Sequence, residues 1–138
     1  MIAVVSPFSV KIRVYYRDTD AGGIVFHANY LAFMEQARTE FLNALGFSVA
    51  ELVRRDAVMF IVHRATLEFL RPARLNEEIE ITAVPVRVGR ARVIFVQKVL
   101  RGADCLVQAE IQLACVDPSS FKPVALPVAV RAKLGFQD

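Results

Sequence analysis

Cysteine is scarce in this chain, which has only Cys105 and Cys115 among its 138 residues. If both lie on one strand, their spacing corresponds to about 33 Å at ~3.3 Å per residue. A disulfide requires α-carbons within about 7 Å, so we expect two reduced thiols, as is usual in the cytoplasm. The two histidines, His27 and His63, form no recognisable metal-ligand spacing with these cysteines. We therefore predict no metal site, and no cofactor.

Long apolar runs are also missing, since none approaches the ~20 residues needed to span a bilayer. The first residues lack the charged and long apolar regions of a signal peptide, so we expect a cytoplasmic protein. Neither sign of charge dominates, because the chain has 17 basic and 14 acidic residues and a net charge of +3. With no nucleic-acid-binding motif present, this modest excess favours a phosphate-bearing partner and does not indicate nucleic acid.

Hydrophobic residues, in contrast, are abundant: they make up 55% of the chain, against 22% charged residues. This composition excludes a disordered chain. A length of 138 residues is close to the commonest domain size, so we treat residues 1–138 as a single domain. So apolar a small domain is expected to hide part of its surface against another copy of itself.

The period of the apolar pattern predicts an α+β fold. Alternation predicts a first strand from Phe8 to Tyr16, with Tyr16 on its core-facing side. Helical spacing predicts a long helix over Asn29–Leu45, with Arg38 on its polar side, ended by Gly46. A capping box at Ser48 starts a short helix. Alternation then predicts strands near residues 58–70, 78–83, 92–100 and 105–116, and a terminal helix opening at Pro127. The long helix and the sheet must cover each other in two layers.

An unusual group of polar residues lies between the first strand and the long helix. It comprises Asp18, Asp20, Gly22, Gly23, His27 and Asn29. One interpretation is structural, with the aspartates capping turns and the asparagine capping the helix. The other is catalytic, because a carboxylate beside the free N–H groups of a helix start can place a nucleophile next to an oxyanion site. The two glycines would let the backbone approach a ligand closely.

A resemblance to a known family favours the catalytic interpretation. The run Arg13-Val-Tyr-Tyr-x-Asp-Thr-Asp-Ala-Gly-Gly-x-Val-x-His-x-x-Tyr30, followed by Glu35-x-Ala-Arg-Thr-Glu40, resembles the hotdog-fold acyl-CoA thioesterases of the 4-hydroxybenzoyl-CoA thioesterase superfamily. Within it, the chain is most similar to the Tol–Pal-associated acyl-CoA thioesterases. The resemblance continues through Pro72-Ala-Arg-Leu75 and Cys115-Val-Asp-Pro118 to Lys122-Pro-x-Ala-Leu-Pro127, and so spans nearly the whole chain.

The resemblance implies a fold, an assembly and a set of site residues. It implies an antiparallel sheet wrapped around one long helix, and a dimer joined edge to edge that in some members pairs into a tetramer, with active sites at the dimer interface. By position, Asp20 matches the catalytic carboxylate, while Tyr16 and His27 match residues lining the same site. The backbone N–H at the helix start, beside His27, would polarise the thioester carbonyl. Asp18 matches a residue that shapes the loop.

These matches predict an acyl-CoA thioesterase in which Asp20 is either a general base for water or a nucleophile. We expect Gly22, Gly23 and Asn29 to contact the substrate. Arg87, Arg90 and Arg92 cluster around the Gly89 turn, and of these we expect Arg90 and Arg92 to contact the CoA phosphates; the alternative is that the turn is an ordinary solvated hairpin tip. Other interpretations are an acyl-carrier-protein thioesterase, which would use the same basic rim, and a non-catalytic acyl-binding or scaffold protein of envelope or lipid synthesis. A dehydratase of the same fold is not favoured, since its histidine pattern is missing.

Overall fold

The computed structural model describes residues 7–135. Residues 1–6, on which the expectation of no signal peptide rests, lie outside the described part, as do residues 136–138. Along the chain the elements are β1 (Phe8–Arg13), the 3₁₀ turn η1 (Tyr16–Asp18), α1 (Asn29–Ala44), α2 (Val49–Asp56), β2 (Met59–Phe69), β3 (Glu78–Val88), β4 (Arg92–Arg101), β5 (Asp104–Val116) and α3 (Val128–Leu134). Among residues 7–135, no helix is both long and apolar enough to cross a membrane.

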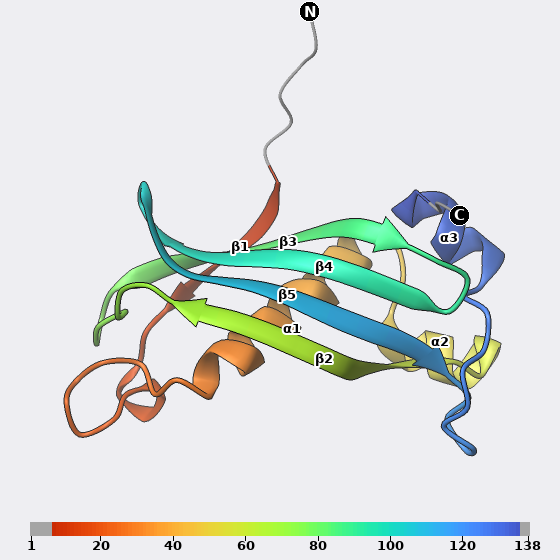
Figure 1. Cartoon of the computed structure of the whole chain (residues 1–138), viewed down its shortest axis with the longest axis horizontal. Coiled ribbons are helices and arrows are strands. Elements are labelled where there is room, and N and C mark those ends of the chain that lie inside the picture. Colours follow the sequence, from red (N-terminus) through yellow and green to blue (C-terminus); the bar gives the residue numbers. More distant parts are fainter. Residues whose placement is uncertain (1–6, 136–138) are drawn as a thin grey trace, which may run out of the picture.

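Five strands form one antiparallel sheet in the order β1-β3-β4-β5-β2, and α1 lies across one of its faces (Figure 1). This confirms the predicted two-layer α+β arrangement. The helix packs on the sheet through Tyr30, Phe33, Met34 and Ala37, each of which exposes 7% or less of its surface. The Phe41 ring adds an edge-on contact with Phe95 of β4, at 5.6 Å between centroids.

Capping residues set the end of α1 and the start of α2. Gly46 adopts φ +94°, and the N–H of Phe47 reaches back to the carbonyl of Leu42, so the glycine ends α1 as predicted. The Oγ of Ser48 then accepts the N–H of Glu51, which begins α2.

Two predictions about the faces of elements are wrong. β1 ends at Arg13, and Tyr16 instead begins η1 with 83% of its surface exposed, because the ladder with β3 ends where Arg13 pairs with Glu78. Arg38 is not on the polar side of α1, since only 7% of its surface is exposed and its Nη1 donates to Oε1 of buried Gln97 at 2.8 Å.

Cys105 and Cys115 both lie on β5, as the sequence analysis assumed, and both are free thiols. β5 is central to the sheet between β4 and β2. β2 therefore forms one edge of the sheet and β1 the other. Among the described residues, nothing pairs with the outer side of β2 over its 11 residues.

Candidate active site

Asp18 organises the loop that joins β1 to α1. Its Oδ2 accepts the N–H of Tyr15 at 2.8 Å, which closes η1. Its backbone carbonyl accepts both the N–H of Phe26 and the Nδ2 amide of Asn29, each at 2.9 Å. These bonds tie the two ends of the loop together, in keeping with the predicted shaping role of Asp18. Asn29 is the first residue of α1 and not its cap, and its side-chain amide braces the loop.

Asp20 sits in a tight turn made by the residues that follow it. Its Oδ1 accepts the N–H of Gly22 at 2.8 Å, its backbone carbonyl accepts the N–H of Gly23, and its own N–H donates to Ile24. Gly23 has φ +77°, which a side chain would disfavour, and a Cβ at Gly22 would lie 3.3 Å from Oδ1 of Asp20. The turn fixes one carboxylate oxygen, while Oδ2 accepts no hydrogen bond from the described residues and Asp20 is exposed.

The start of α1 leaves two backbone donors open. The N–H groups of Asn29, Tyr30 and Leu31 bond to the carbonyls of Phe26, His27 and Ala28. The N–H groups of His27 and Ala28 donate to no acceptor within residues 7–135. They lie where the helix dipole favours negative charge. The loop thus joins an oriented carboxylate to a helix start with uncommitted N–H groups.

The side chain of His27 lines a pocket of about 280 Å³ beside this helix start. Its other walls are Ile24, Tyr30, Phe69, Leu70, Arg71 and Pro72. The His27 ring lies 4.6 Å from that of Phe26 and 6.3 Å from that of Phe69, centroid to centroid. The hydroxyl of Tyr30 accepts the N–H of Ala73, and burial raises the pKa of Tyr30. Asp20 and Tyr16 lie outside the lining of this pocket in the single chain.

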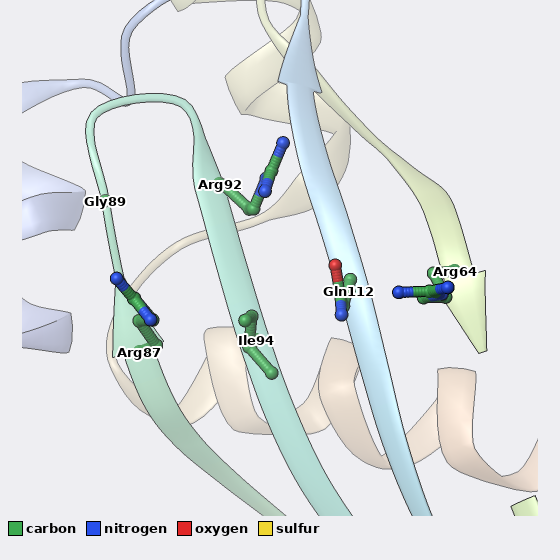
Figure 2. A pocket seen from close by; sticks show the side chains of 6 residues that line it. All are labelled: Arg64, Arg87, Gly89, Arg92, Ile94 and Gln112. Carbon is green, nitrogen blue, oxygen red and sulfur yellow. The ribbon is translucent and has the colours of Figure 1, made fainter. Parts of the chain in front are cut away.

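Three arginines line a larger pocket, of about 390 Å³, on the face of the sheet away from α1 (Figure 2). They are Arg64 of β2, Arg87 of β3 and Arg92 of β4, with Ile94 and Gln112 between them. Among the described residues, none of the three forms an ion pair. Arg90 lies in the β3–β4 turn outside this lining.

Two β-bulges bring these arginines together. The register of β2 shifts between Val62 and Arg64, and that of β3 shifts between Pro85 and Arg87. Simple alternation would place Arg64 on the same face as Val62, which lines a pocket against α1. The extra residue at each bulge turns the next arginine to the opposite face. Sequence reasoning could not have located these shifts.

The structure thus separates the predicted site residues into two groups. The segment from η1 to the start of α1, which lies at one end of the molecule, contains Tyr16, Asp20, Gly22, Gly23, His27 and Asn29 (Figure 1). Arg90 and Arg92 belong to the β3–β4 turn and the start of β4, at the other end. The first group adjoins the Arg101 end of β4, because Arg101 bonds to Pro72 and Glu77, and Glu77 accepts the N–H of Val14. Arg92 begins the same strand, about 30 Å away at ~3.3 Å per residue. Phe69 and Leu70, which line the His27 pocket, had not been predicted to belong to the site, because no sequence pattern gives the packing of a distant strand.

The sheet wrapped over one helix, with this loop at the helix start, defines a hotdog-fold protein. The chain belongs to the thioesterase superfamily, whose family model matches residues 22–107. This membership confirms the predicted fold and the predicted class of enzyme, a thioester hydrolase.

Named relatives agree with this assignment over almost their full lengths. The chain is 39% identical over 125 residues to "Acyl-CoA thioesterase YbgC" of Haemophilus influenzae, covering 91% of this chain and 92% of the relative. It is 41% identical over 127 residues to "Acyl-CoA thioester hydrolase YbgC" of Escherichia coli, covering 91% and 94%. A probable thioesterase from Bartonella henselae has a similar structure, with a TM-score of 0.84 and 34% identity over 88% of this chain and all of that one.

Proposed function

We propose that this protein hydrolyses the thioester bond of acyl-CoA, releasing a carboxylic acid and CoA, with Asp20 as the reacting carboxylate. The observation that carries the proposal is the loop geometry: the N–H of Gly22 holds one oxygen of Asp20, and the other accepts no hydrogen bond within residues 7–135. The same loop leads to the start of α1, where the N–H groups of His27 and Ala28 have no acceptor among these residues. The relatives named acyl-CoA thioesterases support the substrate. Assaying the purified protein on a panel of acyl-CoA thioesters of different chain lengths tests the activity directly.

The chemistry requires little beyond a carboxylate and an oxyanion site. A thioester carbonyl is electrophilic, and its leaving thiol has a pKa near that of cysteine, about 8.5, so general-acid help is dispensable. As a base, Asp20 would take a proton from water while the water oxygen attacks the carbonyl carbon. The C–S bond then breaks and the thiolate receives the proton. As a nucleophile, Asp20 would attack the carbonyl carbon and expel the thiolate, giving a mixed anhydride; water would then hydrolyse the anhydride, release the carboxylic acid and supply the proton that the thiolate takes up.

The backbone N–H groups of His27 and Ala28 are the proposed oxyanion donors. Such donors stabilise charge only as it develops on the carbonyl oxygen, and one well-placed donor contributes about 3–4 kcal/mol in acyl-transfer sites. The His27 ring, which lines the adjacent pocket, would then contact the acyl group or the sulfur. Tyr16 is exposed and begins η1 just before the loop, and we propose that it contacts the substrate. Gly22 and Gly23 would leave room for the thioester beside Asp20.

A second copy of the chain is needed to enclose this exposed site. No described strand pairs with the outer side of β2 along its 11 residues, and Val62, Phe69 and Leu70 on or next to it each expose about half of their surface. Long unpaired edges favour pairing with another strand. We therefore propose a homodimer joined through β2, from which a tetramer would form by further pairing. The free thiols support the predicted cytoplasmic location, a reducing compartment.

A two-fold axis at β2 would also bring the arginines to the catalytic loop. Two copies of an antiparallel edge strand related by such an axis run in opposite directions. The arginine end of one sheet then lies at the same end of the dimer as the Asp20 loop of the other. Arg92, with Arg64 and Arg87, is therefore proposed to bind the phosphates of the CoA whose thioester lies at Asp20 of the second copy. An acidic acyl carrier protein would dock on the same arginines.

Replacing Arg92 with glutamate tests the phosphate contact. We expect the KM for acyl-CoA to rise about tenfold, the loss of one charge-assisted hydrogen bond, while the KM for the matching acyl-pantetheine changes less than about twofold. Arg90→Glu is the matched comparison, and its effect should be smaller because Arg90 lies outside the three-arginine pocket. Equal effects of Arg92→Glu on both substrates would refute phosphate binding there.

Mixed dimers test which chain supplies the arginine. Co-expressing Asp20→Asn and Arg92→Glu chains gives mixed dimers. If each site takes Asp20 from one chain and Arg92 from the other, one of the two sites in a mixed dimer keeps both native residues. With random association, we expect about a quarter of the wild-type kcat/KM, because half of the dimers are mixed and each has one intact site. Activity no higher than the average of the two parent variants would show that each chain uses its own Arg92.

A further inference from the structure

Arg38 is a buried cation on the helix face that packs against the sheet. It exposes 7% of its surface, and its Nη1 donates to Oε1 of Gln97 at 2.8 Å. Gln97 is fully buried and fixed in turn, because its Nε2 donates to the backbone carbonyls of Met34 and Thr82. Among the described residues, no carboxylate forms an ion pair with Arg38. Its buried charge therefore has one neutral acceptor and a rigid orientation.

A guanidinium group has five N–H donors, and within residues 7–135 Arg38 uses one of them, in its bond to Gln97. Burial lowers the pKa of Arg38, and the nearby charge of Glu35 partly offsets this. Within residues 7–135, every fully enclosed side-chain nitrogen or oxygen has a hydrogen-bond partner. The guanidinium nitrogens of Arg38 that make no hydrogen bond within residues 7–135 are therefore not fully enclosed, and Arg38 lines a pocket.

That pocket has a volume of about 150 Å³ and lies between α1, α2 and β2. Its walls are largely apolar, formed by Leu42, Val49, Phe60, Val62 and Leu113, with Glu35, Arg38 and Thr39 as its polar members. The Oγ1 of Thr39 lies 3.3 Å from Oε1 of Glu35, to which it donates. An apolar pocket with a few fixed polar groups is typical of a ligand site that selects by hydrogen bonding.

We propose that this pocket receives the far end of the acyl group, and that Arg38 and Glu35 select acyl groups that carry a hydroxyl there. This inference rests on the proposed acyl-CoA thioesterase function. A hydroxyl matches both polar groups, because its oxygen accepts from Arg38 while its hydrogen is donated to Glu35. A plain alkyl end would leave the donors of Arg38 without an acceptor. A carboxylate end would be attracted by Arg38 but repelled by the charge of Glu35, whereas a neutral hydroxyl meets no repulsion.

The proposed dimer places this pocket at the catalytic loop. Phe60 and Val62, in one half of β2, line the Arg38 pocket, whereas Phe69, at the other end of β2, lines the His27 pocket. If β2 pairs with its copy about its centre, the first half of one strand lies beside the second half of the other. The Arg38 pocket of one copy then continues the His27 pocket of the second. Within a single chain, Tyr30 of the His27 pocket and Arg38 lie eight residues apart on α1, or about 12 Å at ~1.5 Å per residue.

The test compares acyl-CoA pairs of equal chain length, from four to ten carbons, with and without a terminal hydroxyl. For the best-fitting length, we expect the wild-type protein to hydrolyse the hydroxylated member at least about tenfold faster, as kcat/KM. Arg38→Met should bring the ratio close to one, because the hydroxylated member loses its hydrogen bond to the guanidinium group. Arg54→Met, which removes an exposed arginine of α2, is the control and should keep the wild-type ratio.

A second variant keeps the proposal testable if Arg38→Met does not fold. Glu35→Gln changes an exposed side chain and should raise kcat/KM for acyl groups with a terminal carboxylate about tenfold, because the repelling charge is removed. An equal loss on both members of each pair in Arg38→Met would mean that Arg38 only holds α1 on the sheet. Wild-type activity with no hydroxyl preference at any length would overturn this inference alone. Inactivity towards every acyl-CoA would overturn the proposed function as well.

Discussion

Asp20→Asn should lower kcat for acyl-CoA hydrolysis by at least about 10³-fold, with little change in stability. The substitution removes the charge that activates water or attacks the carbonyl, and such groups contribute about 10²–10⁴-fold as general bases. Asparagine keeps a side-chain oxygen that can accept the N–H of Gly22, so the turn should persist. Steady-state kinetics and the thermal midpoint, which should move by no more than about 2–4 °C, measure the two effects separately.

Asp18→Asn is the matched control, because it makes the same chemical change two residues away. Its Oδ2 is committed to the N–H of Tyr15, and its backbone carbonyl bonds are unaffected by the substitution. We expect this variant to keep kcat within about tenfold and to lose some stability. If Asp20→Asn keeps full activity, or if both variants lose activity alike, Asp20 is not the reacting carboxylate.

Val62→Glu should convert the protein to inactive monomers. The side chain of Val62 is 51% exposed on the edge strand, close to the centre of β2, where two copies of the residue would approach each other. Two carboxylates buried there without partners should raise the dissociation constant of the dimer by at least about 100-fold. Sedimentation at several concentrations measures the association, and kcat/KM should fall in proportion to the fraction of dimer.

Val128→Glu provides the comparison for this interface prediction. Val128 begins α3, away from β2, and is 73% exposed, so a glutamate there should change neither assembly nor activity. A Val62→Glu monomer with wild-type activity would contradict the shared site. A Val62→Glu dimer would place the interface on another surface.

The sequence predicted those parts of the fold that depend on neighbouring residues. The bounds of α1 were correct to one residue because Gly46 ends the helix through its own backbone conformation. β1 was extended too far because Val14 and Tyr16 continue the alternation after the ladder with β3 has ended. Arg38 was misplaced because its partner, Gln97, is 59 residues away and its spacing carries no signal.

The residues of the candidate site also differ in how far the sequence could predict them. Asp20 and His27 belong to one contiguous loop, so a single motif could indicate them. The pocket of Arg64, Arg87 and Arg92 needed the register of four strands and the positions of two bulges, neither of which a single sequence reveals. The mixed character of the Arg38 pocket depends on the same long-range packing.

The exposed side of β2 also affects whether the chain aggregates before it dimerises. β2 has eleven residues and no proline, and no described strand pairs with its outer row of amides and carbonyls, so an extended polypeptide can add to it. In a newly synthesised chain, pairing of β2 with a second subunit therefore competes with aggregation through the same strand. The melting temperature of the protein should rise with protein concentration, because association and folding draw on the same edge.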